Sequence, residues 1–191
     1  MTDYPPLYIL RHGETEWNAQ NRLQGRFDSA LTAVGRAQAQ AQRGILATRD
    51  LTGFTALTSP QGRAFHTASI ALAGLVDGIS TDPRLSEIGI GDWAGAQRDA
   101  LMAQTPDARD SYDLYEHAPG GEGFAALHAR CSAFLSTLTA PHILVTHGIT
   151  SRMLRLIVLG QGIEALRDMA GGQGVVFYLA QGTQHRLTLG A

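Results

Sequence analysis

Lysine is absent from this 191-residue chain, so all 15 of its permanently basic side chains are arginines. The absence excludes a Schiff base formed on a lysine amine, and it excludes a Walker-type phosphate loop, which needs a lysine. Arginine is the only permanent cation left, and its forked guanidinium suits bidentate contacts with phosphate or carboxylate oxygens.

Cysteine occurs once, at Cys131, so no internal disulfide can form. The chain has no H-E-x-x-H segment and no pair of cysteines, which argues against a zinc site. We therefore predict no metal and no cofactor. A net charge of -2 also argues against binding nucleic acid over the whole surface.

Long apolar runs are missing too. The opening segment MTDYPPLYILRHG has no basic region, and its apolar stretch is too short for a membrane span or a signal peptide. We expect no contact with a membrane and a cytoplasmic location.

Short apolar runs alternate with segments of helical periodicity, and 44% of the residues are hydrophobic. This alternation predicts one α/β domain over residues 1–191, with a mostly parallel central sheet flanked by helices on both faces. The expected strands are 7–10, 54–58, 79–81, 142–146, 173–180 and 183–189, with a tight hairpin at Gln181-Gly182. The expected helices are 32–48, 61–75, 122–138 and 149–159.

Two segments lack this clear periodicity. Residues 13–31 are predicted to form a long loop, and loops of that length usually serve a site. Residues 91–121 are predicted to form a lid or insertion that contains one short helix near Arg98–Gln104. In the helix that begins after Thr32, the spacing of Ala33, Ala37, Ala41 and Ile45 indicates one buried face.

Polar side chains follow three of the predicted strands. Arg11 and His12 end the first strand, Arg63 comes shortly after the second, and His147 ends the strand at 142–146. In open parallel sheets ligands bind outside the carboxyl ends of the strands. We therefore expect these four side chains to meet at one edge of the sheet.

Such a group of residues is suited to phosphoryl transfer. The two guanidiniums match the oxygens of a phosphoryl group, and their charge favours the neutral, nucleophilic form of His12. His147 is expected to donate a hydrogen bond to the transferring group, helped by the backbone N–H of Gly148 at the following helix start. Glu87 is the candidate acid that protonates the leaving alkoxide.

The same residues carry a resemblance to a known family. The segment Arg11–Asn18 (RHGETEWN) is similar to the signature of the histidine phosphatase superfamily, also called phosphoglycerate mutase-like. The resemblance continues in order through the chain, in Gly25-Arg26, Leu31–Gly35, Thr58–Ala64, Thr67-Ala68, Leu85–Ile88, Gly91–Gly95, Gly120–Glu122 and Val145–Gly148.

The resemblance implies a phosphoglycerate mutase-like fold in which His12 is phosphorylated. It further implies that Arg11 and Arg63 clamp the phosphate, that His147 is the second catalytic histidine and that Glu87 is the proton donor. Asn18 would be a further phosphate ligand, and Arg26 is added to the predicted phosphate-binding set. One departure from the family is Gly123 after Glu122, where a serine is usual.

Several side chains are open to two interpretations. Arg22 and Arg26 either reach the rest of the substrate or are only solvated. Tyr112 and Tyr115 in the predicted lid either contact the substrate or do not.

The resemblance leaves two outcomes for the phosphoryl group. The segment after Glu87 (Ile-Gly-Ile-Gly-Asp-Trp) resembles the phosphatase branch, and the thirty or so residues that follow offer only Arg98 and Arg109 as cations. We therefore predict a metal-independent phosphomonoesterase of the histidine acid phosphatase type, acting on a small-molecule phosphomonoester. The alternatives are a phosphoglycerate-type phosphomutase and a catalytically silent phosphate-binding protein. A homodimer is possible.

Overall fold

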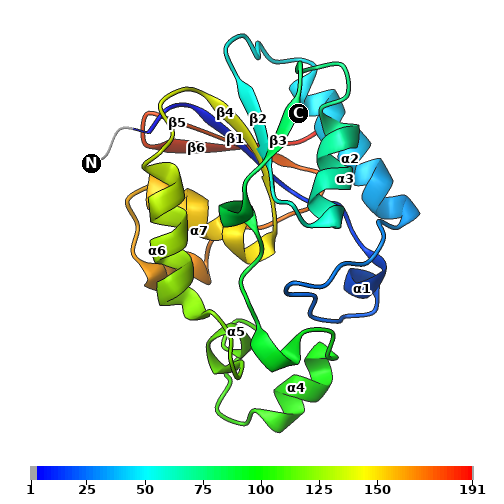
Figure 1. Cartoon of the computed structure of the whole chain (residues 1–191), viewed down its shortest axis with the longest axis vertical. Helices are drawn as coiled ribbons and strands as arrows, with labels where there is room; N and C mark the ends of the chain where they lie inside the picture. Colours follow the sequence, from blue (N-terminus) through cyan, green and yellow to red (C-terminus); the bar gives the residue numbers. More distant parts are fainter. Residues whose placement is uncertain (1–3, 191) are drawn as a thin grey trace.

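The computed structural model describes residues 4–190 and contains a six-stranded sheet of order β3-β2-β4-β1-β5-β6 (Figure 1). The first four strands of this order are parallel to their neighbours, whereas β5 is antiparallel to β1 and β6 is antiparallel to β5. The predicted mostly parallel α/β sheet is confirmed. The strands are β1 (Leu7–Arg11), β2 (Thr55–Thr58), β3 (Ile79–Thr81), β4 (His142–Thr146), β5 (Val176–Ala180) and β6 (Thr183–Leu187).

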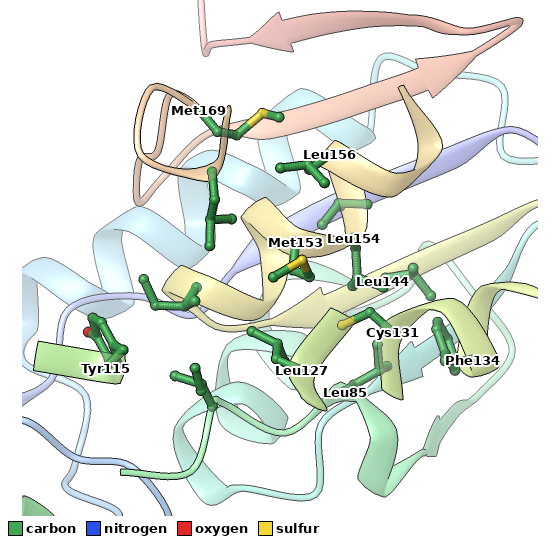
Figure 2. Packing of buried hydrophobic residues seen from close by; sticks show 14 of the residues in the cluster. Leu85, Tyr115, Leu127, Cys131, Phe134, Leu144, Met153, Leu154, Leu156 and Met169 are labelled. Carbon is green, nitrogen blue, oxygen red and sulfur yellow. The ribbon is translucent and has the colours of Figure 1, made fainter. Parts of the chain in front are cut away.

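Helices cover both faces of this sheet. On one side lie α2 (Ala33–Leu46) and α3 (Gly62–Ala71), and on the other lie α6 (Gly123–Leu135) and α7 (Gly148–Val158) (Figure 1). Successive side chains of β1 alternate between the two layers, because neighbouring residues of a strand point to opposite faces. The larger core joins α6 to α7, and Figure 2 shows Cys131 within it, as predicted from its helical face.

Helix α2 begins where the sequence predicts, because the Thr32 side chain accepts a hydrogen bond from the Gly35 amide. The predicted buried face is confirmed only at its end. Ile45 is buried and Ala41 is half-buried, but Ala33 and Ala37 are exposed, and the buried side of the helix runs from Gly35 through Ala39 to Ile45. A methyl group is too small to determine which face is buried, and the close approach of Gly35 to the backbone of Glu14 sets the orientation instead.

Helix α3 ends at Ala71, four residues before the predicted end. Leu72 has already left helical geometry, and Gly74 adopts a positive φ of 71°, a conformation in which helices commonly stop. The predicted hairpin is confirmed, because Gln181 and Gly182 both have positive φ, as a type I′ turn requires.

The predicted loop at 13–31 contains a short helix, α1 (Glu16–Ala19), that the sequence analysis missed. Thr15 and Asn18 form a capping box around its first turn, in which each side chain accepts a hydrogen bond from the backbone N–H of the other. The turn is too short to produce a helical pattern of apolar residues, so periodicity gives no signal for it.

The segment predicted as a lid lies beyond the carboxyl ends of the parallel strands (Figure 1). It contains the predicted helix α4 (Arg98–Gln104), a second short helix α5 (Leu114–His117) and a 3-10 turn η2 (Gly91–Trp93). The remaining 3-10 turns are η1 (Pro83–Leu85) and η3 (Ile163–Leu166). Just after η3, Arg167 forms ion pairs with Asp110 and Asp113, which fasten the lid to the body of the protein.

Within residues 4–190 no helix is both long enough and apolar enough to cross a membrane. Residues 1–3, at the start of the segment where no signal peptide was expected, lie outside the described part of the chain.

Candidate active site

The predicted meeting of the three strand ends is found in the structure. Strand β4 lies between β1 and β2, and backbone hydrogen bonds between β4 and the residues that follow β1 and β2 continue the pairing. The amide of His12 donates to the carbonyl oxygen of Thr146 (2.9 Å), and the amide of Ser59 donates to that of Val145 (2.9 Å). The rings of His12 and His147 are consequently neighbours, with centroids 5.2 Å apart.

The hydrogen bonds of His12 define the state of its ring. Nδ1 lies 2.7 Å from the carbonyl oxygen of Gly13, which can only accept, so Nδ1 carries the ring proton. The Nε group of Arg63 donates to Nε2 of His12 at 3.3 Å, which requires a lone pair on Nε2. Burial first, and then the charges of Arg11 and Arg63, lower the pKa of His12 well below 6.5. The imidazole is therefore neutral, with its lone pair on Nε2, where it accepts the hydrogen bond from Arg63.

Arg63 is buried in the first turn of α3, and four of its five N–H donors bind protein atoms. Besides the bond to His12, its Nη1 group donates to the Phe27 carbonyl (2.6 Å) and to Oδ1 of Asp28 (2.8 Å), and its Nη2 group donates to the Gly25 carbonyl (3.0 Å). The guanidinium thus fixes the loop at residues 25–28 beside the nucleophile, and one donor stays available for a ligand.

His147 is fully buried, and its Nε2 lies 2.8 Å from the hydroxyl of Ser59. Burial, together with Arg63 and the neighbouring ring of His12, lowers its pKa well below 6.5. Within residues 4–190, Nδ1 of His147 and Nε of Arg11 are buried atoms without a hydrogen-bond partner. Buried polar atoms are normally paired, and a bound anion would supply an acceptor for Nε of Arg11. It would do the same for Nδ1 of His147 in the tautomer whose Nε2 accepts from the Ser59 hydroxyl.

Glu87 is held by the first turn of α7. Its carboxylate accepts hydrogen bonds from the amides of Ile149 (3.2 Å) and Thr150 (3.0 Å) and from the Thr150 hydroxyl (3.0 Å). A Cβ atom on Gly148 would lie 3.4 Å from the Arg11 guanidinium and 3.5 Å from the Glu87 carboxylate. These are ordinary van der Waals distances, so both side chains lie directly beside the helix start.

Glu122 precedes Gly123, the position at which the sequence departs from the family pattern. The Glu122 side chain supports the loop that contains Glu87. Its carboxylate accepts from the Gly89 amide (3.0 Å) and pairs with Arg130 at 2.7 Å. Arg130 in turn donates to the carbonyl of Ser86 (3.0 Å). Glu122 does not line the cavity described next, so its contacts position the loop.

A cavity of about 160 Å³ opens beside His12. Of the predicted site residues it is lined by Arg11, His12, Asn18, Arg63, Glu87 and Gly148. The Oδ1 atom of Asn18 accepts a hydrogen bond in the capping box of α1. The NH₂ group of Asn18 is therefore left to donate into the cavity. His147 lies behind this lining, next to the ring of His12.

Arg26 is not brought to this site. It is exposed, with its guanidinium 5.3 Å from the ring centre of Phe27, and it lines a separate cavity beside Gly89. Gly25, with a positive φ of 50°, turns the chain just before it. The prediction included Arg26 in the phosphate-binding set because Gly25-Arg26 belongs to the family resemblance, and the structure places its side chain outside this cavity.

The cavity wall also contains residues that the sequence analysis left open or missed. Arg22, Tyr112 and Tyr115, each open to two interpretations, all line it. Arg152 was missed, although it lies four residues after Gly148 on α7 and therefore on the same helix face. The lid contributes Arg98 and Ser111. Across residues 4–190, no three side chains of the metal-binding types lie together.

Comparison with known proteins agrees with this geometry. The model of the histidine phosphatase superfamily (branch 1) matches residues 7–187. A protein of Proteus mirabilis described as probable phosphoglycerate mutase GpmB is 36% identical over 179 residues, covering 85% of this chain and 79% of that protein. A Salmonella paratyphi C protein of the same description is 37% identical over 162 residues, covering 81% and 74%.

Solved structures share the fold along almost the whole chain. A putative alpha-ribazole-5'-P phosphatase from Escherichia coli superposes with a TM-score of 0.80 at 27% identity, covering 99% of this chain and 97% of that one. A mycobacterial glucosyl-3-phosphoglycerate phosphatase, solved with VO3, superposes with a TM-score of 0.79 at 26% identity, covering 98% and 99%. The predicted phosphoglycerate mutase-like architecture is confirmed.

Proposed function

Because the chain belongs to the histidine phosphatase superfamily, we propose that it hydrolyses small phosphomonoesters through a phosphohistidine formed on His12. One observation carries the proposal: a neutral imidazole presents its Nε2 lone pair to a cavity that Arg11 and Arg63 also line. A neutral ring nitrogen is a competent nucleophile, whereas a protonated one is not.

In the first step, Nε2 of His12 attacks the phosphorus atom and the bond to the ester oxygen breaks. The proton on Nδ1 stays in place, and the Gly13 carbonyl stabilises the positive charge that develops on the ring. The departing alkoxide takes a proton from the Glu87 carboxyl group. The products of this step are the free alcohol, a Glu87 carboxylate and phosphohistidine.

In the second step, a water molecule gives a proton to Glu87 and attacks the phosphorus atom. The bond between Nε2 and phosphorus breaks, inorganic phosphate forms, and the neutral imidazole returns. In both steps Arg11 and Arg63 donate hydrogen bonds to the phosphoryl oxygens, which neutralises charge on the transferring group without any metal. His147, behind the ring of His12, adds a donor through Nδ1 in the tautomer whose Nε2 accepts from the Ser59 hydroxyl.

A second candidate activity is transfer of the phosphoryl group to another hydroxyl of the same substrate, as in a phosphoglycerate-type phosphomutase. Two observations favour this phosphomutase activity. Relatives are described as probable phosphoglycerate mutases. The cavity is also lined by more arginines than the sequence of the lid alone indicated. The chemistry at His12 is the same for both activities, and the difference is whether water or a hydroxyl accepts the phosphoryl group.

The test measures phosphate release from 4-nitrophenyl phosphate and from a panel of metabolite phosphomonoesters, with and without EDTA. We expect release in both conditions, and we expect an acid-labile, base-stable phosphate label on the protein. His12→Ala should abolish the release and the label. The matched control is His66→Ala, which removes an exposed histidine on α3 and should leave both unchanged.

A label that survives His12→Ala would remove that residue from the proposed role. Loss of activity in EDTA would exclude the metal-independent reaction. Isomerisation of phosphoglycerates that is faster than their hydrolysis, followed by ³¹P NMR, would select the mutase.

A further inference from the structure

Gln61 is the N-cap residue of α3, but its side chain does not cap the helix. An N-cap side chain usually accepts a hydrogen bond from an amide of the first turn. Here Asp28 does so from another segment, because its carboxylate accepts from the amides of Gly62 (2.8 Å) and Arg63 (3.3 Å). The side-chain amide of Gln61 is therefore available to bind other parts of the chain.

The side chain of Gln61 bridges two segments that contribute to the site. Its Oε1 atom accepts a hydrogen bond from the backbone amide of Glu87 (2.8 Å), and its Nε2 group donates to the carbonyl oxygen of Gly25 (2.7 Å). A backbone amide can only donate and a carbonyl oxygen can only accept, so these partners fix which end of the side-chain amide is the oxygen. The bridge thus joins the segment of the proposed proton donor to the loop at residues 25–28.

The Gly25 end of the bridge is also a contact of the phosphate-binding Arg63. The Gly25 carbonyl accepts a second hydrogen bond, from Nη2 of Arg63 (3.0 Å), so both lone pairs of this oxygen are used. A Cβ atom on Gly25 would lie 2.5 Å from the side chain of Ile90, and both residues line the cavity. The loop and the segment after Glu87 are therefore packed against each other beside the bridge.

At the other end, two different elements hold Glu87. The first turn of α7 binds its carboxylate, through the amide and the hydroxyl of Thr150 among other donors, whereas Gln61 binds its backbone amide. Loss of the backbone contact would let the residue shift while its contacts to α7 persist. A displacement of about 1 Å in an active site can cost about 10²-fold in rate.

The backbone of Gln61 makes a third link, to the second histidine. Its amide donates to the hydroxyl oxygen of Ser59 (3.2 Å), and this hydroxyl lies 2.8 Å from Nε2 of His147. The side-chain oxygen of Gln61 is farther from the hydroxyl, at 3.5 Å, and already accepts from Glu87. The nearer acceptor for the Ser59 proton is His147, which favours the tautomer with the ring proton on Nδ1.

We propose that Gln61 is a positioning residue, which fixes the backbone of Glu87 relative to the loop that Arg63 holds and thereby orients the proton donor toward the leaving group. The inference rests on the proposed function, because it takes Glu87 as the acid and Arg63 as a ligand of the phosphoryl group. Gln61 is not among the described residues that line the cavity, so it acts through its neighbours and not on the substrate.

Gln61→Met tests the bridge, because methionine has a similar length and removes both side-chain hydrogen bonds. We expect kcat for glycerol 3-phosphate, an alkyl phosphomonoester, to fall about tenfold, the equivalent of one hydrogen bond, and kcat for 4-nitrophenyl phosphate to fall about threefold or less. Gln61→Asn, whose shorter side chain cannot reach both partners, should give the same pattern and serves if Gln61→Met does not fold. The matched control is Gln40→Met at an exposed position of α2, which should leave both rates unchanged.

A double-mutant cycle shows whether Gln61 acts through Glu87. Glu87→Gln protein has no side-chain proton to orient, so the addition of Gln61→Met should lower its kcat for glycerol 3-phosphate by about twofold or less. A full tenfold loss in that background, equal losses for the two substrates in the single variants, or single variants with unchanged rates would each overturn the positioning role and leave the phosphatase proposal standing.

The two proposals also fail separately. If no compound releases phosphate, the proposed function falls, and hydrogen exchange followed by NMR then decides without turnover whether Gln61 anchors the backbone of Glu87. The Glu87 amide should exchange about tenfold faster in Gln61→Met than in the unmodified protein, and at an unchanged rate in Gln40→Met. Equal exchange of this amide in Gln61→Met and the unmodified protein would overturn the bridge.

Discussion

At the scale of single residues, the reactivity of His12 depends on the position of one proton. The Gly13 carbonyl holds that proton on Nδ1, and burial, together with the charges of Arg11 and Arg63, lowers the pKa of the ring and disfavours a second proton. The same guanidiniums that keep the ring neutral are the groups that would receive the phosphoryl oxygens, so the site prepares its nucleophile and its anion-binding groups together.

The role of Glu87 is tested by the leaving group. Glu87→Gln keeps the shape of the side chain but removes the transferable proton, so kcat for an alkyl phosphomonoester should fall about 10²-fold or more. 4-Nitrophenyl phosphate needs little protonation of its leaving group and should lose far less. Steady-state kinetics on both substrates measures this difference, and equal losses would deny Glu87 the acid role.

Thr150 is a positioning residue for Glu87. Its hydroxyl lies 3.0 Å from the Glu87 carboxylate and 2.8 Å from the Ser86 carbonyl. Thr150→Val should lower kcat for an alkyl phosphomonoester about tenfold, again with a smaller loss for 4-nitrophenyl phosphate, while Thr150→Ser should restore most of the rate. A Thr150→Val protein whose two substrates lose activity equally would show that the hydroxyl is only structural.

Single residues also show the limit of sequence interpretation. His12, Arg11 and Arg63 could be predicted because each follows a strand of the parallel sheet. Arg152 could not be assigned in this way, because its approach to the cavity depends on how α7 packs against the sheet. The prediction that Arg26 belongs to the phosphate-binding set was wrong, because the turn at Gly25 separates Arg26 from its sequence neighbours at the cavity.

At the scale of elements, the position of α2 depends on two glycines that meet backbone to backbone. A Cβ on Gly13 would lie 2.2 Å from the Gly35 carbonyl oxygen, and a Cβ on Gly35 would lie 2.0 Å from the Glu14 carbonyl oxygen. The helix therefore docks directly on the loop that follows the nucleophile, and the apolar pattern of α2 contains no sign of this contact.

Gly35→Ala should push α2 away from the loop after His12. We expect a loss of about 2 kcal/mol in the free energy of unfolding, typical of overpacking, with a fall in kcat. Gly44→Ala is the control on the same helix, because its new methyl would meet only the flexible end of Leu189 and alanine favours the helix. Urea unfolding compares the two, and a Gly35→Ala protein as stable as Gly44→Ala would contradict the docking contact.

Regular elements were predicted best where hydrophobic patterns are strong. Strand β4 has the expected bounds and helix α7 lies within one residue of them, whereas α1 and α5 are single short turns set by capping and by lid contacts. Periodicity needs several turns to emerge, so the sequence predicted the sheet and the large helices but, apart from α4, not the internal structure of the two irregular segments.

At the scale of the whole molecule, two neutral histidines, His12 and His147, are buried just beyond the ends of β1 and β4. The unfolded chain takes up protons on both near pH 6.5, while the folded protein does not, so the free energy of unfolding should fall as the pH drops below that value. Once both sites titrate only in the unfolded state, the slope approaches about 1.4 kcal/mol per pH unit for each histidine.

Chemical denaturation between pH 8 and pH 5.5 measures this slope. The stability should be fully present above pH 6.5 and should decline below it, and His12→Asn should remove about half of the decline. A His12→Asn protein with an unchanged slope would show that these rings are not the cause.

The backbone hydrogen bonds around His12 predict the order in which parts of the protein lose their structure. Strand β1 is hydrogen-bonded on both sides, and the amide of His12 extends the pairing to β4. Amides of core strands open with the highest free energies, whereas lids and ligand-binding loops open more easily. The amide of His12 should therefore be among the slowest of the protein to exchange with heavy water, and on heating the lid around the cavity should loosen before the strand end that carries His12.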